Sequence, residues 1–424
     1  MTNLPDQVGR DVVVIGGCGH VGLPLAIAFA DRGARVGIYD VSEAAVATVN
    51  SGRMPFAEPG ADEALSRVLG AGRLVASADP AIVATAEHVI VVIGTPVDEH
   101  LNPKQIAITK ALGGCSEFFR DGQMLILRST VFPGVTALVE KMLSKLGRQI
   151  EVAFCPERIA EGKAMTELFE LPQIVSARTP AGTKRASALF ARLTGKIVVM
   201  TPEEAELAKL FTNVWRYIKF ATANQLYMMA NEQGLDFDRI RRGLADDYPR
   251  AADMPAAGFA AGPCLFKDTM QLAAFNHNNF PLGHAAMAVN EGLPLYLVHR
   301  LEQRFDLGSM TVGILGMAFK AGSDDIRSSL SYKLKRILAF KADTVLCTDP
   351  YVTVDPGLLP LEEVLDRSDL LVVGAPHPEY RGLAVDKPAA DIWDVLGSGV
   401  RVCPSVLVSR GWSLPTTRAK LSSA

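Results

Sequence analysis

The sequence predicts an α/β protein with two doubly wound, parallel-sheet domains joined by a central helical region that contains one long helix. Short β-branched runs alternate with Ala- and Leu-rich segments over roughly the first 200 residues, and the alternation returns at Thr311. Between these regions, Glu203–Gln233 lacks Pro and Gly and is apolar at helical spacing. Continuous apolar strands separated by helices are typical of a parallel sheet covered on both faces.

The first α/β region supplies the elements of a sheet with its covering helices. Runs rich in Val and Ile predict the strands, and apolar residues at a spacing of about 3.6 predict the helices. The strands are Asp11–Ile15, Arg35–Tyr39, His88–Ile93, Gln123–Leu127, Ile150–Ala153 and Lys196–Met200, and the helices are Leu23–Asp31, Ile106–Phe119 and Val135–Leu146.

The middle and the end of the chain have different textures. Glu203–Gln233 predicts one helix about 45 Å long. A loop-rich stretch, Tyr248–Cys264, follows it, and a helical pattern resumes over Asn290–Gln303. Further strands are predicted at Thr311–Leu315, Thr344–Thr348, Leu370–Val373 and Arg401–Val402. These changes predict domains at residues 1–201, 202–305 and 306–411 and a polar tail at 412–424.

Composition and charge exclude several classes of partner. The chain has 43 Lys+Arg, 46 Asp+Glu and a formal charge of −3 without a basic run, so no nucleic acid is expected. Its ten-residue apolar run, Val21–Ala30, is shorter than the roughly 18 residues that a membrane span needs. The N-terminus lacks a signal-peptide layout. We therefore expect a cytoplasmic protein without a membrane partner.

A glycine-rich motif follows the first predicted strand. Gly17, Gly19 and Gly22 form G-x-G-x-x-G at the start of a helix, and Val21 precedes the last glycine. This arrangement lets a pyrophosphate approach the N–H groups of the helix start. Asp40 ends the next strand region, 18 residues after Gly22, where a carboxylate accepts hydrogen bonds from ribose hydroxyls and repels a 2′-phosphate. The motif predicts a Rossmann-like domain that binds NAD.

Two further strands end in hydroxyl-bearing residues. Gly94-Thr95-Pro96 and Arg128-Ser129-Thr130 follow apolar strands, at the sheet edge where open α/β proteins bind ligands. Each segment is equally consistent with an ordinary turn that contains a capping Ser or Thr.

The cysteines and histidines predict neither disulfides nor a metal site. Cys18, Cys115, Cys155, Cys264, Cys347 and Cys403 contain no CxxC pair, and the seven histidines show no HxxH or HxxxH spacing. Cys264 differs from the others because a Gly-Pro turn leads through it into a predicted helix. A thiol at the positive end of a helix dipole suits a nucleophile.

Two pairs of polar residues are spaced four apart. Lys209 and Asn213 share one face of the predicted long helix, where a cation and an amide could stabilise an oxyanion. The alternative interpretation is a solvated surface pair. Glu157 and Glu161 follow the end of a predicted strand.

Together these segments resemble the UDP-glucose/GDP-mannose dehydrogenase family, the nucleotide-sugar 6-dehydrogenases. The resemblance extends over nearly the whole chain and includes Lys267-Asp268 after Cys264, Gly316-Met-Ala-Phe-Lys320, Asp325-Ile-Arg327-Ser-Ser and Asp349-Pro350. It implies an NAD-binding domain, a central helical dimerisation domain and a second Rossmann-like domain that binds the UDP-sugar.

The resemblance also implies a four-electron oxidation of the sugar C6 alcohol to a carboxylate, with NAD as the acceptor. Cys264 would carry a thiohemiacetal and then a thioester. Lys209 and Asn213 would hold the oxyanion, Asp268 and Thr130 would position water, and Glu157 would assist thioester hydrolysis. Thr95, Thr130 and Arg327 would lie on the cofactor side, and Glu161, Lys209, Asn213 and Lys320 would contact substrate. Arg250 would reach the substrate of a neighbouring subunit in a homodimer or higher oligomer.

The sequence combines signatures of different substrate branches. Ala261-Gly262-Pro263 replaces the Gly-Gly-Ser that usually precedes the cysteine in UDP-glucose enzymes, and Pro156-Glu157-Arg158 resembles the UDP-N-acetylmannosamine branch. Lys267-Asp268 resembles the UDP-glucose and GDP-mannose branches. UDP-glucose and a UDP-N-acetylhexosamine therefore both remain candidate substrates. The alternative functions are a single-hydride dehydrogenase of the 6-phosphogluconate or 3-hydroxyacid type and a non-catalytic nucleotide-binding paralogue.

Overall fold

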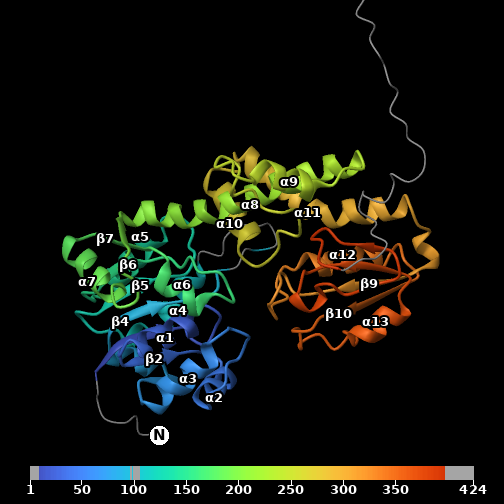
Figure 1. The fold of residues 1–424 in the computed structure, drawn as a ribbon. Coiled ribbons are helices and arrows are strands. Elements are labelled where there is room, and N and C mark those ends of the chain that lie inside the picture. The colour runs from blue at the N-terminus through green and yellow to red at the C-terminus, as the bar shows by residue number, and fades with distance from the viewer. Residues whose placement is uncertain (1–8, 96–97, 99–105, 397–424) are drawn as a thin grey trace, which may run out of the picture. The chain divides into compact units, whose positions relative to one another are not determined.

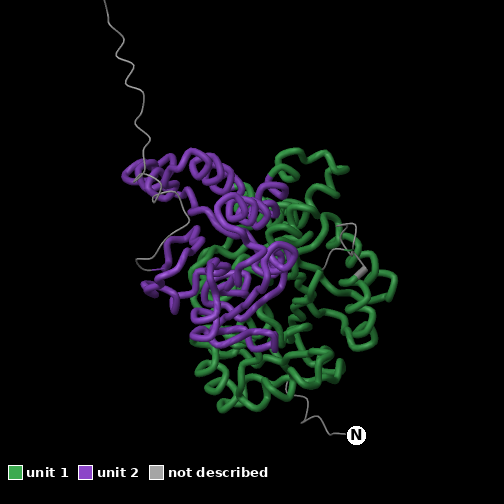
Figure 2. The backbone as a smooth tube through the Cα atoms, turned by 90° about the vertical axis from the view of Figure 1, so that its right-hand side faces the viewer, with its two compact units in different colours: residues 1–218, 263–285 green, residues 219–262, 286–424 purple. Residues whose placement is uncertain are grey.

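The structure is a computed structural model that describes residues 9–95, 98 and 106–396. The predicted strand at Arg401–Val402, Cys403, Pro96 and the tail at 412–424 lie outside the described residues. The chain divides into two compact units, which Figure 2 distinguishes by colour. Unit 1 comprises Met1–Ile218 and Pro263–Ala285, and unit 2 comprises Lys219–Gly262 and Ala286–Ala424.

Unit 1 is built around a sheet that has eight strands within the described residues, in the order β3-β2-β1-β4-β5-β6-β7-β8 (Figure 1). Neighbouring strands are parallel except β6 and β7, which are antiparallel. The strands are β1 (Arg10–Ile15), β2 (Val36–Tyr39), β3 (Leu74–Ser77), β4 (Ala86–Val91), β5 (Met124–Leu127), β6 (Glu151–Phe154), β7 (Gln173–Ala177) and β8 (Ile197–Met200). The six predicted strands are confirmed, and β3 and β7 are additional.

Helices cover both faces of this sheet, as the doubly wound prediction requires. The alternating residues of β1 show the two faces, because Val12 and Val14 pack into one core while Val13 and Ile15 pack into the other. The first face is covered by α1 (Gly22–Asp31), α2 (Glu43–Asn50), α3 (Ala61–Gly70), α6 (Ala164–Glu170) and α7 (Pro180–Phe190), and the second by α4 (Ile106–Gly113) and α5 (Val135–Lys145). Ligand-binding loops therefore gather at the carboxyl edge of the strands.

Helix α8 (Pro202–Glu232) confirms the long helix that the sequence predicts. Its first part is fixed to unit 1 by Glu206, whose buried carboxylate accepts the N–H groups of Gly134 and Thr136 at 2.7 and 2.8 Å at the start of α5. Helix α10 (Leu265–Phe275) packs on the same part of α8, in a cluster of Leu210, Val214 and Leu272. These contacts position the residues of α8 and α10 that carry the candidate chemistry.

Unit 2 contains a parallel sheet of four strands in its described part, in the order β10-β9-β11-β12. The strands are β9 (Thr311–Leu315), β10 (Thr344–Thr348), β11 (Leu370–Val373) and β12 (Ala389–Ala390). Helices α12 (Leu330–Leu338) and α13 (Leu361–Arg367) lie in the two cores beside it. The unit also contains α9 (Phe237–Ala245) and α11 (Pro281–Glu302) from Ala286 onward.

Two predicted helices have different limits in the structure. The helix predicted over Ile106–Phe119 ends at Gly113, because Gly113 and Gly114 interrupt it, and a short 3₁₀ turn follows. Helix α11 begins at Pro281, earlier than the predicted Asn290, and continues through Pro294. Among the described residues, no helix has both the length and the apolar character that crossing a bilayer requires.

Candidate active site

The glycine-rich turn joins β1 to α1 at the carboxyl edge of the sheet. A Cβ on Gly17 would lie 2.8 Å from Ile38, and one on Gly22 would lie 2.7 Å from the carbonyl oxygen of Gly16. Packing therefore excludes a side chain at both positions. Gly19 is different, because no atom of the described chain lies within 4 Å of its Cβ position. It leaves open space beside the first turn of α1, as close approach of a pyrophosphate requires.

Asp40 lies beside this turn, directly after β2. Its Oδ2 accepts the N–H of Cys18 at 3.0 Å, and its Oδ1 accepts the N–H of Ser42 at 3.1 Å. At the start of α1, Val21 occupies the N-cap position, and its apolar side chain forms no capping hydrogen bond. The open glycine, the helix start and the fixed carboxylate together fit a bound NAD.

The hydroxyl-bearing residues after β4 and β5 are joined at the same edge. Thr95 Oγ1 donates to the carbonyl oxygen of Thr130 at 2.6 Å, and the N–H of Ile93 donates to Ser129 Oγ at 2.8 Å. Lys267, from the first turn of α10, donates from Nζ to Thr95 Oγ1 at 3.3 Å. The structure thus connects the strand ends to the helix that follows Cys264, through a lysine that sequence reasoning did not select as a site residue.

Asp268 connects α10 to the pair on α8. Its side chain is fully buried, and its Oδ2 accepts a hydrogen bond of 2.5 Å from Asn213 Nδ2. The other oxygen, Oδ1, lies 3.4 Å from Lys267 Nζ. Lys209 lies one helical turn before Asn213 and is 9% exposed. Within the described residues no carboxylate forms an ion pair with Lys209. Because Lys209 and Asn213 are both buried, they are not a solvated surface pair.

Cys264 occupies the N-cap position of α10 and is exposed. Its carbonyl oxygen accepts the N–H of Asp268 at 2.8 Å, which places the two residues one turn apart on the helix. The other cysteines of the described chain are buried, and burial raises the pKa of each thiol to about 11 or 12: Cys18, Cys115, Cys155 and Cys347. At neutral pH these four are inert thiols.

Glu157 lies in a buried polar network below the strand ends. One carboxylate oxygen is bound by the guanidinium of Arg128, and the other accepts the N–H groups of Arg158 and Ile159 at 2.6 and 2.8 Å. Arg128 is 1% exposed and also donates to Gln173 at 2.9 Å. Both oxygens of Glu157 are therefore occupied. The sequence left the segment of Arg128 open between a ligand-binding edge and an ordinary turn, and it did not predict this network.

Glu161 lies in the loop between β6 and α6. Its carboxylate is 4.0 Å from His20 in the glycine-rich turn, and the ring of His20 packs on Phe56 with centroids 4.0 Å apart. The loop is held by the buried Glu58, which accepts the N–H of Gly162 at 2.9 Å. His20 and Glu58 were not selected from the sequence, since neither belongs to a spaced motif.

The remaining candidates lie in unit 2. Arg250 is exposed, and its guanidinium donates to the hydroxyl of Tyr248 at 2.9 Å. Lys320 Nζ lies 5.5 Å from the ring centroid of Phe319. Arg327 is bound side-on by Asp325, with Nε 2.8 and 2.9 Å from its two oxygens. The contacts given for these three residues are all with other residues of unit 2.

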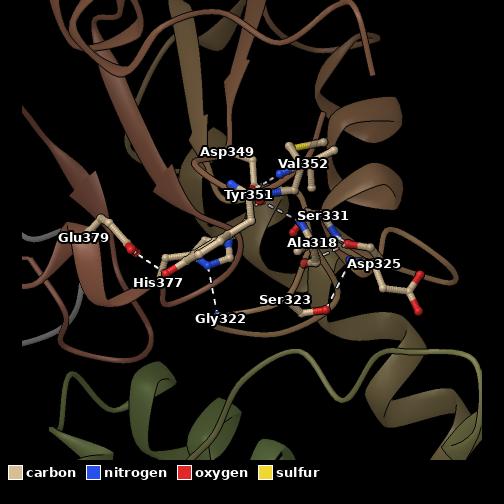
Figure 3. Close-up of polar contacts among 12 residues, drawn as sticks. Ala318, Gly322, Ser323, Asp325, Ser331, Asp349, Tyr351, Val352, His377 and Glu379 are labelled. Atoms are coloured by element: carbon tan, nitrogen blue, oxygen red, sulfur yellow. Dashed lines mark hydrogen bonds and ion pairs between the residues drawn. The ribbon is translucent and has the colours of Figure 1, made fainter. Parts of the chain in front are cut away.

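Asp349 is a hub of hydrogen bonds at the carboxyl edge of the unit 2 sheet (Figure 3). It accepts the N–H groups of Met317, Ala318, Tyr351 and Val352 and a contact of 3.0 Å from His377 Nε2. Burial opposes its charge, but the interactions with His377 and the backbone prevail and lower its pKa to about 2. His377 has no motif in the sequence and was not predicted.

Sequence profiles of one family match three successive parts of the chain. The UDP-glucose/GDP-mannose dehydrogenase family matches at residues 10–194 with its NAD binding domain, at 203–292 with its central domain and at 313–396 with its UDP binding domain. The last match indicates a UDP-sugar substrate. The residues described above fit the cofactor that the first match implies.

Full-length relatives show the same family. A UDP-N-acetyl-D-mannosamine dehydrogenase of Yersinia pestis is 28% identical over 403 residues, covering 88% of this chain and 95% of the relative. An NDP-N-acetyl-D-galactosaminuronic acid dehydrogenase of Ralstonia solanacearum is 28% identical over 401 residues, covering 89% and 93%. The solved UDP-glucose dehydrogenase of Pyrobaculum islandicum superposes with a TM-score of 0.86 at 26% identity, covering 95% and 100%. The chain therefore belongs to the UDP-glucose/GDP-mannose dehydrogenase family and is an NAD-dependent nucleotide-sugar dehydrogenase, an oxidoreductase.

Proposed function

We propose that this protein oxidises the C6 alcohol of a UDP-sugar to a carboxylate, through an aldehyde and a thioester on Cys264. The observation that carries the proposal is the exposure of Cys264 and its position in the fold. Cys264 alone among the described cysteines is exposed, and it lies at the start of a helix one turn from a buried carboxylate. A single-hydride dehydrogenase has no use for such a thiol.

The proposed steps balance as two two-electron oxidations and one hydrolysis. NAD supplies a hydride acceptor for each oxidation. Loss of a hydride from C6 and of the hydroxyl proton gives the aldehyde, and the thiolate of Cys264 then forms a C–S bond to give a thiohemiacetal. Loss of the remaining C6 hydride and the hydroxyl proton gives the thioester. Water adds to it, the C–S bond breaks, and the carboxylate and the free thiol are released.

Lys209 and Asn213 are the proposed oxyanion donors. Both project from one face of α8, and Lys209, which is 9% exposed, has no carboxylate partner among the described residues. One hydrogen of the Asn213 amide is donated to Asp268, which orients the amide and leaves its second hydrogen for a substrate oxygen. Donors that are fixed in advance stabilise the developing charge without reorganisation.

Thioester hydrolysis needs a positioned water molecule. We assign its positioning to Asp268 and Thr130, and Glu157 would assist the hydrolysis. Asp268 is fixed by Asn213 and lies beside the helix start that carries the thiol, and the carbonyl of Thr130 is held by Thr95. Glu157 would act through its charge and position, since Arg128 and two backbone N–H groups already bind its oxygens.

A UDP-N-acetylhexosamine is the first candidate substrate, and UDP-glucose is the second. The match of residues 313–396 to a UDP binding domain supports the nucleotide. The named activities of the relatives from Yersinia pestis and Ralstonia solanacearum support an N-acetylated sugar, and that of the Pyrobaculum islandicum structure supports glucose.

The reaction is tested by supplying NAD⁺ with UDP-glucose, UDP-galactose, UDP-N-acetylglucosamine and UDP-N-acetylmannosamine, with GDP-mannose and TDP-glucose as nucleotide controls. We expect two NADH for each sugar consumed, measured by absorbance and by mass spectrometry of the product. One NADH per sugar would instead support the single-hydride dehydrogenase. Binding of UDP and NAD without turnover of any sugar would support the non-catalytic paralogue.

We also propose a homodimer that forms through the central region, residues 202–305. Phe211 and Trp215, one turn apart on α8, are 52% and 59% exposed, which is unusual for such large apolar side chains. Arg250 is exposed and bound only to Tyr248 in the contacts given above, and the family resemblance implies that it reaches the substrate of a second copy. Light scattering should give twice the chain mass, and Trp215→Glu should give monomers. A wild-type monomer with full activity would contradict the proposal.

A further inference from the structure

A buried histidine and aspartate lie together at the carboxyl ends of the unit 2 strands (Figure 3). Asp349 directly follows β10, and His377 follows β11. Both side chains are 0% exposed, and His377 Nε2 lies 3.0 Å from Asp349 Oδ2. The rings of Tyr351 and Tyr380 pack on His377 with centroid distances of 5.0 and 5.6 Å. The proposed reaction assigns no task to this pair.

The pair holds both sides of the loop that carries Lys320. Asp349 Oδ2 accepts the two N–H groups of residues 317 and 318, at 2.6 and 2.9 Å. On the other side, His377 Nδ1 accepts the N–H of Gly322 at 3.1 Å. The backbone on either side of Lys320 is therefore bonded to the same two side chains.

Dense packing supports these anchors. A Cβ on Gly316 would lie 2.5 Å from the carbonyl oxygen of Ala375, and one on Gly374 would lie 2.4 Å from the carbonyl oxygen of Gly316. The loops after β9 and β11 thus touch backbone to backbone. Little space therefore separates the loop that carries His377 from the loop that carries Lys320.

The hydrogen bonds define the protonation state of the ring. A backbone N–H can only donate, so Nδ1 of His377 presents its lone pair to Gly322, and the ring proton lies on Nε2, where Asp349 accepts it. A proton on Nδ1 would oppose the N–H of Gly322 and break that contact. The other ionisable groups that face the ring are Tyr351 and Tyr380, and Glu379 accepts a hydrogen bond from the Tyr351 hydroxyl.

We propose that His377 is a positioning residue for substrate binding: in its neutral form it fixes, together with Asp349, the loop that presents Lys320 to the UDP-sugar. The proposal rests on the proposed role of Lys320 as a substrate ligand. Loss of the acceptor at Nδ1 would release Gly322 and loosen one side of the loop, which would weaken UDP binding.

Two conservative variants separate the two hydrogen bonds of the ring. His377→Asn keeps an amide oxygen near the Nδ1 position and can still accept from Gly322, whereas His377→Gln keeps a donor near the Nε2 position and can still donate to Asp349. Binding of UDP to the full chain is measured by calorimetry at pH 8. We expect a Kd within threefold of wild type for His377→Asn and at least tenfold weaker for His377→Gln.

The matched control is Glu379→Gln, which removes the carboxylate that accepts from the Tyr351 hydroxyl beside the ring but leaves both hydrogen bonds of His377 in place. We expect this variant to bind UDP with the wild-type Kd.

The outcomes distinguish this inference from the proposed function. An unchanged Kd in Lys320→Met removes the proposed role of Lys320. A weakened Kd in Lys320→Met with wild-type binding in His377→Gln, or equal weakening in both His377 variants, overturns the role of His377. If the His377 variants do not fold, ¹⁵N NMR of the wild-type imidazole decides, because a ring protonated on Nδ1 at pH 8 overturns the inference and one protonated on Nε2 supports it.

Discussion

The thiol of Cys264 is the group whose removal should have the largest effect on the reaction. Serine has nearly the same size but is a far weaker nucleophile toward the aldehyde at neutral pH, so Cys264→Ser should form UDP-uronate at least about a thousandfold more slowly. NAD⁺ should bind within twofold of wild type, since Cys264 belongs neither to the glycine-rich turn nor to the segment of Asp40. Product is measured by mass spectrometry and NAD⁺ binding by fluorescence titration.

The buried cysteines supply the control for this prediction. Iodoacetamide should modify Cys264 in the folded protein and spare the four thiols whose pKa burial raises. Undiminished uronate formation by Cys264→Ser, or by the alkylated protein, would remove the cysteine from the mechanism.

Single residues were predictable where spacing within one element decides their neighbours. Lys209 and Asn213 share a helix face because they are four residues apart. Cys264 was expected at the start of a helix because the Gly-Pro turn directly before it is typical of a helix start. Lys267 could not be found in this way, since it contacts Thr95 from 172 positions further along the chain. The buried partners of Arg128 could not be predicted for the same reason, because Glu157 follows β6 and Gln173 begins β7.

At the scale of elements, the turn between β1 and α1 makes its own prediction. Gly19→Ala should leave the melting temperature unchanged, because the added methyl group meets no atom of the described chain. It should weaken NAD⁺ binding about tenfold or more, since that space is where the pyrophosphate must approach. Gly70→Ala is a matched control, because its Cβ also meets nothing within 4 Å but lies in α3. Equal NAD⁺ affinity in both variants would contradict this account.

The elements themselves were predictable in proportion to their length and regularity. Helix α8, with 31 residues, has a long uninterrupted period, so both of its ends were placed within one residue. Strands β3 and β7 have four and five residues with polar ends, and such short runs do not separate strand from helix or loop. The antiparallel pairing of β7 with β6 has no counterpart in either segment's own sequence.

At the scale of the whole molecule, the alternation of strands and helices predicted two doubly wound sheets, and both are present. The chain passes between the two compact units at three places. The crossing between Gly262 and Pro263 falls in the loop-rich stretch. Those between Ile218 and Lys219, in α8, and between Ala285 and Ala286, in α11, lie inside helices, where composition does not mark them. Composition reveals a boundary only where the chain leaves its regular structure.

The hydrogen-bonded carboxylate of Asp349 should make the free energy of unfolding of the whole molecule depend on pH in the acid range. The pKa of Asp349 is lowered to about 2 in the folded protein, against about 3.9 in an unfolded chain, so its charged form favours folding. This contribution, about 2 kcal/mol, is fully present above pH 4 and is lost as the pH falls from about 4 to about 2.

Asp349→Asn should therefore lower the free energy of unfolding most at pH 7, and the difference from wild type should shrink toward pH 2.5. Urea titrations at pH 7, 4 and 2.5 measure it, with Asp386→Asn as the control that removes an exposed carboxylate. A difference that stays constant over this range would show that Asp349 acts through its shape and not through its charge.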